Sequence, residues 1–307
     1  MSPRPKRLRR SQLAVPGVSE KMLTKAAAME VDHVFCDLED AVAPSAKAGA
    51  RNTIVDALNG LDWGRTVRCV RVNDVGTEWC FEDIITIVEG AGSNLDTILL
   101  PKPLNASDVL FADKLLSQLE DKLKLDKKIG LEVLIEEVEA MQNVTEIANS
   151  CSRLECMIFG MGDYAASQGL VVKDIGTNDG YPGDMFHYPR YQMTIAARVA
   201  GIDAVDGPFA DFRNDEAYRE ECRRALTLGM VGKWAIHPSQ IEPALEVFSP
   251  SQEDVDFARE IISVYKNAEA EGIGSVGHKG VMVDAASARL FQNLSLIHIS
   301  EPTRRWS

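Results

Sequence analysis

The sequence lacks any run of apolar residues long enough to cross a lipid bilayer as a helix. Its basic first ten residues, MSPRPKRLRR, are not followed by an apolar stretch with a cleavage site, so no secretory signal is predicted. We interpret this basic start as a solvated arm in preference to part of an anion site. The expectation is a cytoplasmic protein that makes no contact with membranes.

The sequence also lacks paired cysteines and a surplus of basic residues. None of its six cysteines forms a CxxC pair, which favours reduced and mostly buried thiols over a zinc site. The net charge is −13, which argues against nucleic acid as the main partner. A polyanionic ligand would therefore need a local basic pocket that works against the overall charge.

What the sequence does contain is a regular alternation of strand-like and helical segments. Eight short apolar runs are expected to be strands, at residues 12–15, 33–38, 67–72, 97–100, 130–135, 156–161, 204–206 and 233–236. Amphipathic stretches lie between most of them, at residues 20–29, 46–58, 79–89, 107–123, 137–149, 187–200 and 215–228. Apolar strands separated by helices predict a parallel sheet. Eight such units favour a closed TIM (β/α)8 barrel over a doubly wound open sheet, because no GxGxxG follows the first strand.

The chain continues beyond the eighth strand for longer than a barrel requires. We expect a barrel over residues 1–247 and a C-terminal extension over 248–293, whose glycine-rich stretch EGIGSVG suits a lid. The loop at residues 173–185, rich in glycine, aspartate and proline, is the other segment expected to move. Residues 294–304, LSLIHISEPTR, resemble a translated sequencing adapter, so residues 294–307 are expected to be a non-native tail; an amphipathic helix with a polar tail is the alternative.

Polar residues gather where the predicted strands end, which is where barrels carry their chemistry. The candidates are Asp37, Glu39, Asp40, Arg71, Asn73, Lys102, Glu136, Asp163, Asp206 and His237. Glu136 and Asp163 follow adjacent predicted strands, and oxygen ligands without a histidine–cysteine cluster favour Mg2+. The alternative is that each carboxylate caps the helix that follows it.

Two of these candidates have competing interpretations. Arg71 ends an otherwise apolar strand, where a guanidinium needs an anionic or carbonyl partner. Either Arg71 faces a substrate or it forms a structural ion pair with Glu39 or Asp40, and both can hold if one carboxylate orients it. For His237 a structural role is favoured over that of a general base.

Several of these segments together resemble a known family. DLEDAV, VRVN, LLPK, LIEE, FGMGDYAAS, DGPFADF, LGMVGKWAIHPSQ and MVDAAS are similar to the HpcH/HpaI aldolase and citrate lyase β-subunit family, and within it to the malyl-CoA lyases. The similarity runs from about residue 11 to residue 293. It implies a Mg2+-dependent, reversible cleavage of (S)-malyl-CoA to glyoxylate and acetyl-CoA, or of β-methylmalyl-CoA to glyoxylate and propionyl-CoA.

The resemblance also implies roles for individual residues. Glu136 and Asp163 would hold Mg2+, with Mn2+ as a possible replacement, and Arg71 would contact the carbonyl oxygens of the substrate. Small 2-oxo acids would meet the backbone of Gly162 together with Ile236 and His237, CoA would meet Lys25, and Asp284 would be the base. In this family Asp284 would act on the site of a neighbouring subunit, within a homotrimer or homohexamer.

The resemblance leaves several points open. Where relatives carry an aromatic residue and a CoA-binding arginine, this chain has Ala14 and Ser19, so the details of CoA binding are open. A citramalyl-CoA lyase, a (3S)-malyl-CoA thioesterase and a non-catalytic subunit are the alternatives. A thioesterase needs a base near the thioester carbon, for which Asp37, Glu39 and Asp284 are candidates. The retained metal pair and strand-end arginine argue against a non-catalytic subunit.

Overall fold

The structure is a computed structural model that describes residues 4–171 and 183–299, with side chains up to Gln292. Most of the loop predicted at residues 173–185 therefore lies outside the described residues. The chain divides into two compact units, Met1–Phe248 and Ser249–Ser307, which are described separately below. Among the described residues, no helix is long and apolar enough to span a bilayer.

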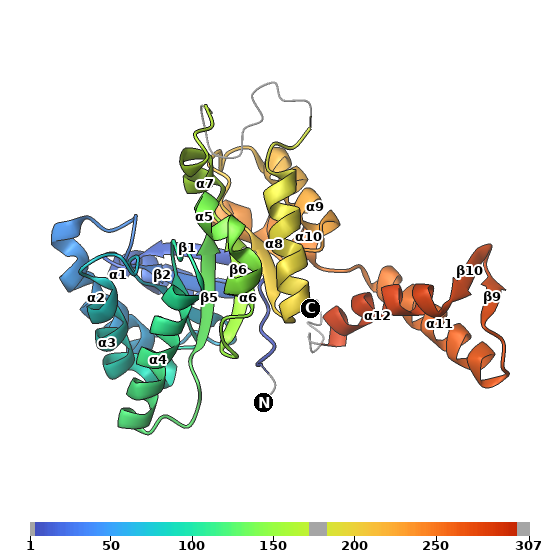
Figure 1. The fold of residues 1–307 in the computed structure, drawn as a ribbon, viewed down its shortest axis with the longest axis horizontal. Coiled ribbons are helices and arrows are strands. Elements are labelled where there is room, and N and C mark those ends of the chain that lie inside the picture. Colours follow the sequence, from blue (N-terminus) through green and yellow to red (C-terminus); the bar gives the residue numbers. More distant parts are fainter. Residues whose placement is uncertain (1–3, 172–182, 300–307) are drawn as a thin grey trace. The chain divides into compact units, whose positions relative to one another are not determined.

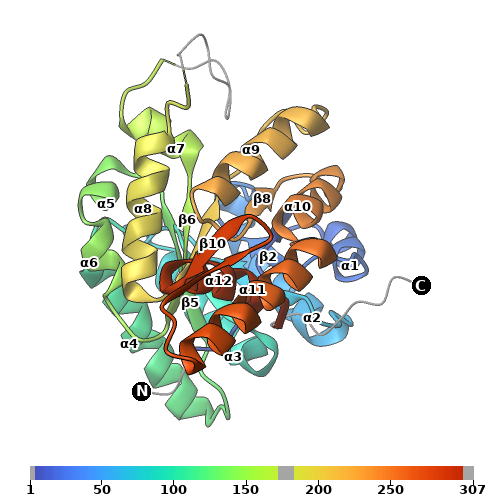
Figure 2. The same ribbon diagram turned by 90° about the vertical axis from the view of Figure 1, so that its right-hand side faces the viewer.

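The first unit is a closed barrel of parallel strands surrounded by helices (Figures 1 and 2). The strands are β1 (Ser11–Pro16), β2 (His33–Asp37), β3 (Val67–Arg71), β4 (Thr97–Leu100), β5 (Gly130–Ile135), β6 (Leu154–Phe159), β7 (Asp203–Asp206) and β8 (Lys233–Ala235). They pair in sequence order, and β8 pairs with β1 to close the barrel. All eight predicted strands are present, and the predicted (β/α)8 barrel is confirmed.

The helices of this unit form the outer layer. They are α1 (Glu20–Ala27), α2 (Lys47–Gly60), α3 (Cys80–Ala91), α4 (Ala106–Leu123), α5 (Val138–Gln142), α6 (Val144–Ala148), α7 (Met161–Ser167), α8 (His187–Ala200), α9 (Asp215–Thr227) and α10 (Ile241–Phe248). The single helix predicted over residues 137–149 is instead two, divided at Asn143. The Asn143 side chain donates to the Leu104 carbonyl, a polar contact that competes with helix continuation.

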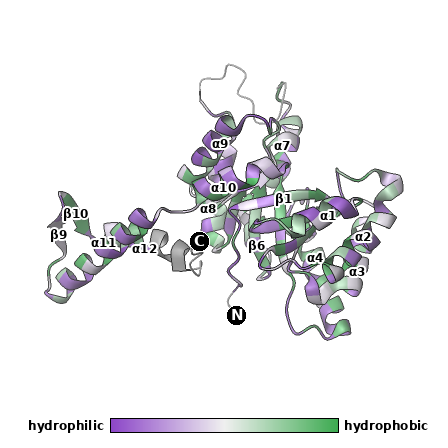
Figure 3. Cartoon of the chain, turned by 180° about the vertical axis from the view of Figure 1, so that it is seen from behind, coloured by the Kyte–Doolittle hydropathy of each residue, from purple (hydrophilic) through white to green (hydrophobic). Residues whose placement is uncertain are grey.

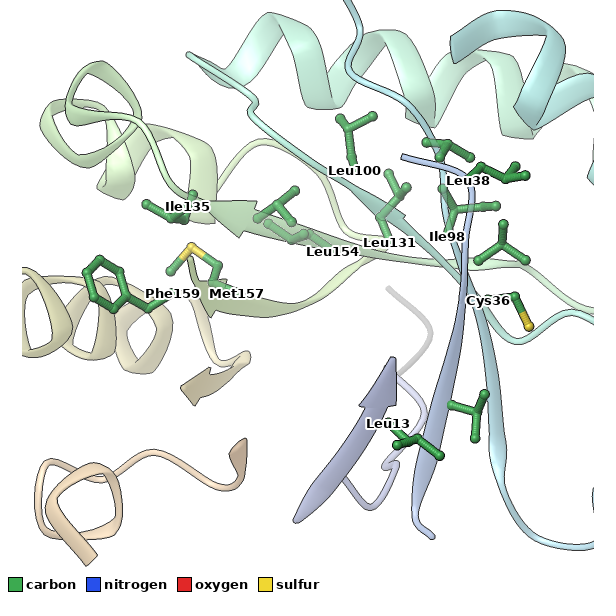
Figure 4. Packing of buried hydrophobic residues seen from close by; sticks show 14 of the residues in the cluster. Leu13, Cys36, Leu38, Ile98, Leu100, Leu131, Ile135, Leu154, Met157 and Phe159 are labelled. Atoms are coloured by element: carbon green, nitrogen blue, oxygen red, sulfur yellow. The ribbon is translucent and has the colours of Figure 1, made fainter. Parts of the chain in front are cut away.

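Two apolar layers hold the barrel together. Alternate strand residues point inward and meet in a small central cluster that includes Phe35, Leu99, Leu134 and Trp234. The intervening residues point outward and pack under the helices; Figure 4 draws part of this outer cluster, with Leu131, Leu154 and Met157 among the labelled residues. In Figure 3 the outer helix α9 is mostly hydrophilic. Six free cysteines fit this pattern, since all but one are buried, as expected from the sequence.

The basic N-terminal segment closes the amino end of the barrel. Arg9 and Arg10 are buried, and Arg9 lies 2.9 Å from both Glu155 and Asp203. Arg10 pairs with Asp32 at 2.7 Å. The interpretation of this segment as a solvated arm is therefore wrong for these residues: their partners are carboxylates at the starts of the strands, and each buried charge is offset by another.

The second unit consists of two helices and a β-hairpin. These elements are α11 (Gln252–Ala270), β9 (Ser275–His278), β10 (Val281–Asp284) and α12 (Ala285–Ile299). The hairpin, which the sequence analysis did not predict, occupies the glycine-rich stretch and turns at Lys279 and Gly280, both with positive φ. Helix α12 continues through Ile299, past the boundary at residue 293 that the sequence suggested.

Candidate active site

Charged side chains from consecutive strands meet at the carboxyl end of the barrel. Asp37 ends β2, Arg71 ends β3, Lys102 follows β4, Glu136 follows β5, and Asp163 lies on the first turn of α7. The Lys102 ammonium is 2.8 Å from Glu39 Oε1 and 3.8 Å from Asp163 Oδ1. The structure therefore brings together most of the carboxylates predicted for the site, around two cations.

Arg71 is held by a carboxylate that the sequence analysis did not choose. Its Nε and Nη2 donate to the two oxygens of Asp37, each at 2.7 Å. Glu39 is a second partner at 2.9 Å, and Asp40 is more distant at 3.7 Å. Burial alone would raise the pKa of Asp37, but Arg71 and the backbone N–H groups of Glu39 and Ala41 hold it below its ordinary value.

One nitrogen of Arg71, Nη1, has an ion-pair partner but no aligned hydrogen bond among the described residues. Nη1 lies 2.9 Å from Glu39 Oε2, yet the two are not aligned for a hydrogen bond, and Oε2 has no hydrogen-bond partner among the described residues. The guanidinium also lies over the rings of Phe35 and Trp234, which cover its face inside the barrel. A fixed guanidinium with a free edge is suited to binding a substrate oxygen.

Glu39 and Glu136 are buried carboxylates in an acidic setting. Burial raises the pKa of Glu39, and nearby Asp40 adds to the effect, while Arg71 and Lys102 oppose it. The pKa of Glu136 is raised well above its ordinary value by burial and then by the charges of Glu39 and Asp163. The carboxylates outnumber the cations here, so the site has room for further positive charge.

Glu136 is the carboxylate of this site that most clearly lacks a partner among the described residues. The residue is 2% exposed, and its Oε1 has no hydrogen-bond partner among the described residues. Gly160 leaves room for it, because a Cβ at that position would lie 2.6 Å from Glu136 Cβ. Neither Glu136 nor Asp163 caps a helix, since the N-caps of α5 and α7 are Glu137 and Gly160. These carboxylates fit a hard divalent cation.

The remaining predicted residues lie at the edges of this cluster or outside it. Gly162 directly precedes Asp163 on α7. Ile236 is 40% exposed after β8, and the next residue, His237, bonds Ser239 and stacks on Phe212, which matches its structural interpretation. Lys25 is exposed on α1. None of these side chains has a described contact with the charged cluster.

Asp284 belongs to the second unit, where it ends β10 and precedes α12. Its Oδ1 accepts the Ser287 N–H at 2.9 Å, so it caps α12. The bond from the Ser287 N–H, together with that from its hydroxyl, lowers the pKa of Asp284. These contacts favour the carboxylate form, which is the form that a base requires.

With this geometry in view, the comparisons with known proteins become informative. The sequence pattern of the HpcH/HpaI aldolase/citrate lyase family matches residues 10–238, which include all eight barrel strands and the charged cluster. The chain belongs to this family. Membership accounts for the closed barrel and for the clustering of carboxylates at the carboxyl ends of its strands.

Individual relatives in the family show which enzymes this chain is similar to. The L-malyl-CoA/β-methylmalyl-CoA lyase of Cereibacter sphaeroides is 42% identical over 295 residues, which are 93% of each chain. The (3S)-malyl-CoA thioesterase of the same species is 34% identical over 276 residues, 90% of this chain and 89% of the thioesterase. The structure of CitE from Mycobacterium tuberculosis with magnesium, acetoacetate and coenzyme A is 27% identical, with a TM-score of 0.74 over 95% of this chain and 98% of that one.

Two lysines near the carboxyl end of the barrel, Lys47 and Lys102, were not assigned a role from the sequence. Lys47, at the start of α2, donates to the carbonyls of Leu38 and Glu39 and to Asn73, and so fixes the loop after β2. Nothing in the sequence distinguishes it from a solvated residue at a helix end. Lys102 is already among the strand-end candidates of the sequence, but no role was assigned to it there.

Proposed function

We propose that this family member is a magnesium-dependent carbon–carbon lyase. It cleaves (S)-malyl-CoA to glyoxylate and acetyl-CoA, or β-methylmalyl-CoA to glyoxylate and propionyl-CoA, and the reaction is reversible. The proposal rests mainly on Glu136, a buried carboxylate with an unpartnered oxygen among the described residues, close to the charge of Arg71. Likeness to L-malyl-CoA/β-methylmalyl-CoA lyase over 93% of the chain supports the choice of substrates.

Glu136 and Asp163 would hold the cation, Mg2+ or in its place Mn2+. Mg2+ in proteins usually takes one or two carboxylates and completes its shell with water and substrate, which this pair allows. When bound, the cation would supply a Lewis acid that polarises the substrate oxygens. The pair fits because Glu136 is buried with a free oxygen, while the Asp163 side chain is 47% exposed and open to ligands.

The protein groups would carry the proton and the developing charge. In the cleavage direction the substrate hydroxyl loses its proton, and Glu39, with its raised pKa and free Oε2, is the candidate acceptor. The carbon–carbon bond then breaks, the hydroxyl carbon becomes a carbonyl, and the electron pair moves onto the thioester as an enolate. Arg71 Nη1 would stabilise the enolate oxygen. Asp284, after taking up a proton from solvent, would protonate the enolate carbon, and as the carboxylate it would remove that proton in the reverse direction. The proton held by Glu39 would return to solvent, which restores the site.

The binding residues are proposed from the family resemblance. The backbone of Gly162, together with Ile236 and His237, would contact the small 2-oxo acid, and Lys25 would contact the CoA. Their positions support these roles in part. Gly162 lies next to Asp163, Ile236 has an exposed side chain beyond β8, and Lys25 is on the helix that follows β1.

Product analysis tests the reaction class. Purified protein incubated with malyl-CoA and Mg2+ is expected to release glyoxylate, trapped as its phenylhydrazone, together with acetyl-CoA. Free malate and CoA without glyoxylate would identify a thioesterase instead. Parallel rates with malyl-CoA, β-methylmalyl-CoA and citramalyl-CoA would assign the substrate, since one methyl group changes selectivity by only about 1–3 kcal/mol.

We also propose a homotrimer or homohexamer in which residues 248–293 serve as a lid. An apolar stripe on α8 supports self-association: Tyr188, Tyr191, Ile195 and Val199 lie on one helical face, with Tyr188 70% and Val199 72% exposed. Exposed apolar faces of this kind mark subunit contacts. Within such an oligomer, Asp284 of one subunit would act on the barrel of another.

A mixing experiment tests the action of Asp284 in trans. Glu136→Ala should lack the cation and Asp284→Ala should lack the base, so each variant alone is expected to be nearly inactive. After dissociation and joint reassembly, hybrid oligomers combine an intact barrel with an intact lid and should regain a fraction of the activity. Differently tagged subunits verify that hybrids form. Hybrids without activity, or full activity of Asp284→Ala alone, would contradict the assignment.

A further inference from the structure

Lys102 sits at the centre of the charged cluster without a role in the proposed reaction. Its ammonium is 2.8 Å from Glu39 Oε1, 3.8 Å from Asp163 Oδ1 and 3.9 Å from Asp40 Oδ1. The side chain is only 21% exposed, so these charges interact with little screening by water. Of the three carboxylates, Glu39 alone is close enough for a hydrogen bond.

The backbone at Lys102 is held in an unfavourable conformation. Its φ of 49° lies in the left-handed region, which side chains with a Cβ rarely adopt. The other two such non-glycine residues among those described, Lys124 and Lys279, lie at ordinary positions, a helix C-cap and a hairpin turn. Lys102 is at neither, and lies between Pro101 and Pro103. Strain kept at a site of converging charges indicates that the position of the ammonium matters.

The contact between Lys102 and Glu39 determines what Arg71 can do. Glu39 gives Oε1 to Lys102, which leaves Oε2 near Arg71 Nη1 but without an aligned hydrogen bond. Without the lysine, Glu39 would be free to turn both oxygens onto the guanidinium. Arg71 Nε and Nη2 already donate hydrogen bonds to Asp37, so Nη1 is the nitrogen that remains for the substrate.

We propose that Lys102 is a positioning residue of the lyase site. By binding Glu39 Oε1 it keeps Glu39 Oε2, which lies 2.9 Å from Arg71 Nη1, out of hydrogen-bond alignment, so that the N–H groups of Nη1 can reach the enolate oxygen. The expected loss of turnover rests on the proposed function. The expected change in the contact between Glu39 and Arg71 does not.

Lys102→Met is the first test. Turnover of malyl-CoA with saturating Mg2+ is expected to fall by about 10²-fold, because Glu39 would then occupy Arg71 Nη1, the donor to the enolate oxygen. The KM for the thioester should change little. Binding of Mn2+, measured by calorimetry without substrate, should be unchanged or tighter, since a neighbouring positive charge is removed. Lys102→Arg keeps the charge and should recover most of the turnover. A crystal structure of Lys102→Met should show both Glu39 oxygens on Arg71.

Lys102→Gly and Lys124→Gly form a matched pair. Both relieve a positive φ, so the melting temperature of Lys124→Gly should stay level or rise. Lys102→Gly also loses the ion pair with Glu39, so it should still unfold cooperatively but with a melting temperature that reflects both changes. Only Lys102→Gly should lose turnover, which separates the effect from a change in folding.

Several results would overturn the proposal. These are near-normal turnover in Lys102→Met, weakening of Mn2+ binding in step with turnover, or a crystal structure with Glu39 unmoved. If the wild-type protein cleaves no malyl-CoA, the proposed function fails, and the crystal structure still decides the role of Lys102.

Discussion

Glu136→Gln is expected to remove divalent cation binding and to lower lyase turnover by about 10³-fold or more, because a Lewis acid supplies several kcal/mol of transition-state stabilisation. The melting temperature of the chelated protein should not fall. Glutamine has the same shape, and it removes a buried charge that Glu39 and Asp163 repel. Turnover, calorimetric Mn2+ titration and thermal melting measure the three effects.

The control for this prediction is the same substitution three residues further along the chain. Glu139→Gln changes an exposed glutamate on α5 and should leave cation binding and turnover unchanged. Chelated wild-type protein should be as inactive as Glu136→Gln, and added Mg2+ or Mn2+ should restore only the wild type. Full activity of the chelated wild type would exclude a catalytic cation.

Arg71→Lys is expected to reduce turnover by at least about 10²-fold while the protein still unfolds cooperatively. A lysine ammonium can pair with Asp37, but it cannot hold both oxygens of Asp37 and still present a donor to the enolate. Some loss of thermal stability should accompany the change, because the two-point contact is buried. Steady-state kinetics at saturating Mg2+ and thermal melting are the measurements.

The control for Arg71 lies on the same strand. Arg68 on β3 pairs with Asp96 at 3.0 Å, away from the carboxyl end of the barrel, so Arg68→Lys should keep near-normal turnover. Normal turnover in Arg71→Lys would reduce Arg71 to a structural partner of Asp37.

The barrel could be predicted because its strands carry a strong local signal. Each is a short apolar run bounded by an amphipathic helix, and β2, β5 and β6 are buried at every position. Short elements could not be predicted. The turn from β6 into α7 occurs at Gly160 within an apolar stretch. Glu136 approaches Gly160 too closely for a side chain there, and this is a tertiary contact that local patterns do not encode.

The site could be predicted as a set of residues but not as a set of contacts. Strand ends identify Arg71, Glu136 and Asp163, whereas the partner of Arg71 depends on register. Asp37 and Arg71 are register neighbours across β2 and β3, and this pairing places the carboxylate beside the guanidinium. Glu39 and Asp40, the partners that the sequence suggested for Arg71, form ion pairs with it but no aligned hydrogen bonds. The hairpin of β9 and β10 was also missed, because its two strands are short and are identified by their pairing with each other.

The ion pairs that close the amino end of the barrel have a consequence for how the chain is made. Arg9 meets Asp203 across 194 positions, and Gln12 accepts a hydrogen bond from Trp234 across 222. At about 5–20 residues per second, β1 leaves the ribosome on the order of ten seconds or more before β8 exists to pair with it. During that time β1 has an unpaired edge able to associate with other strands. A nascent chain of this enzyme therefore depends on protection from aggregation until its last strand has been synthesised.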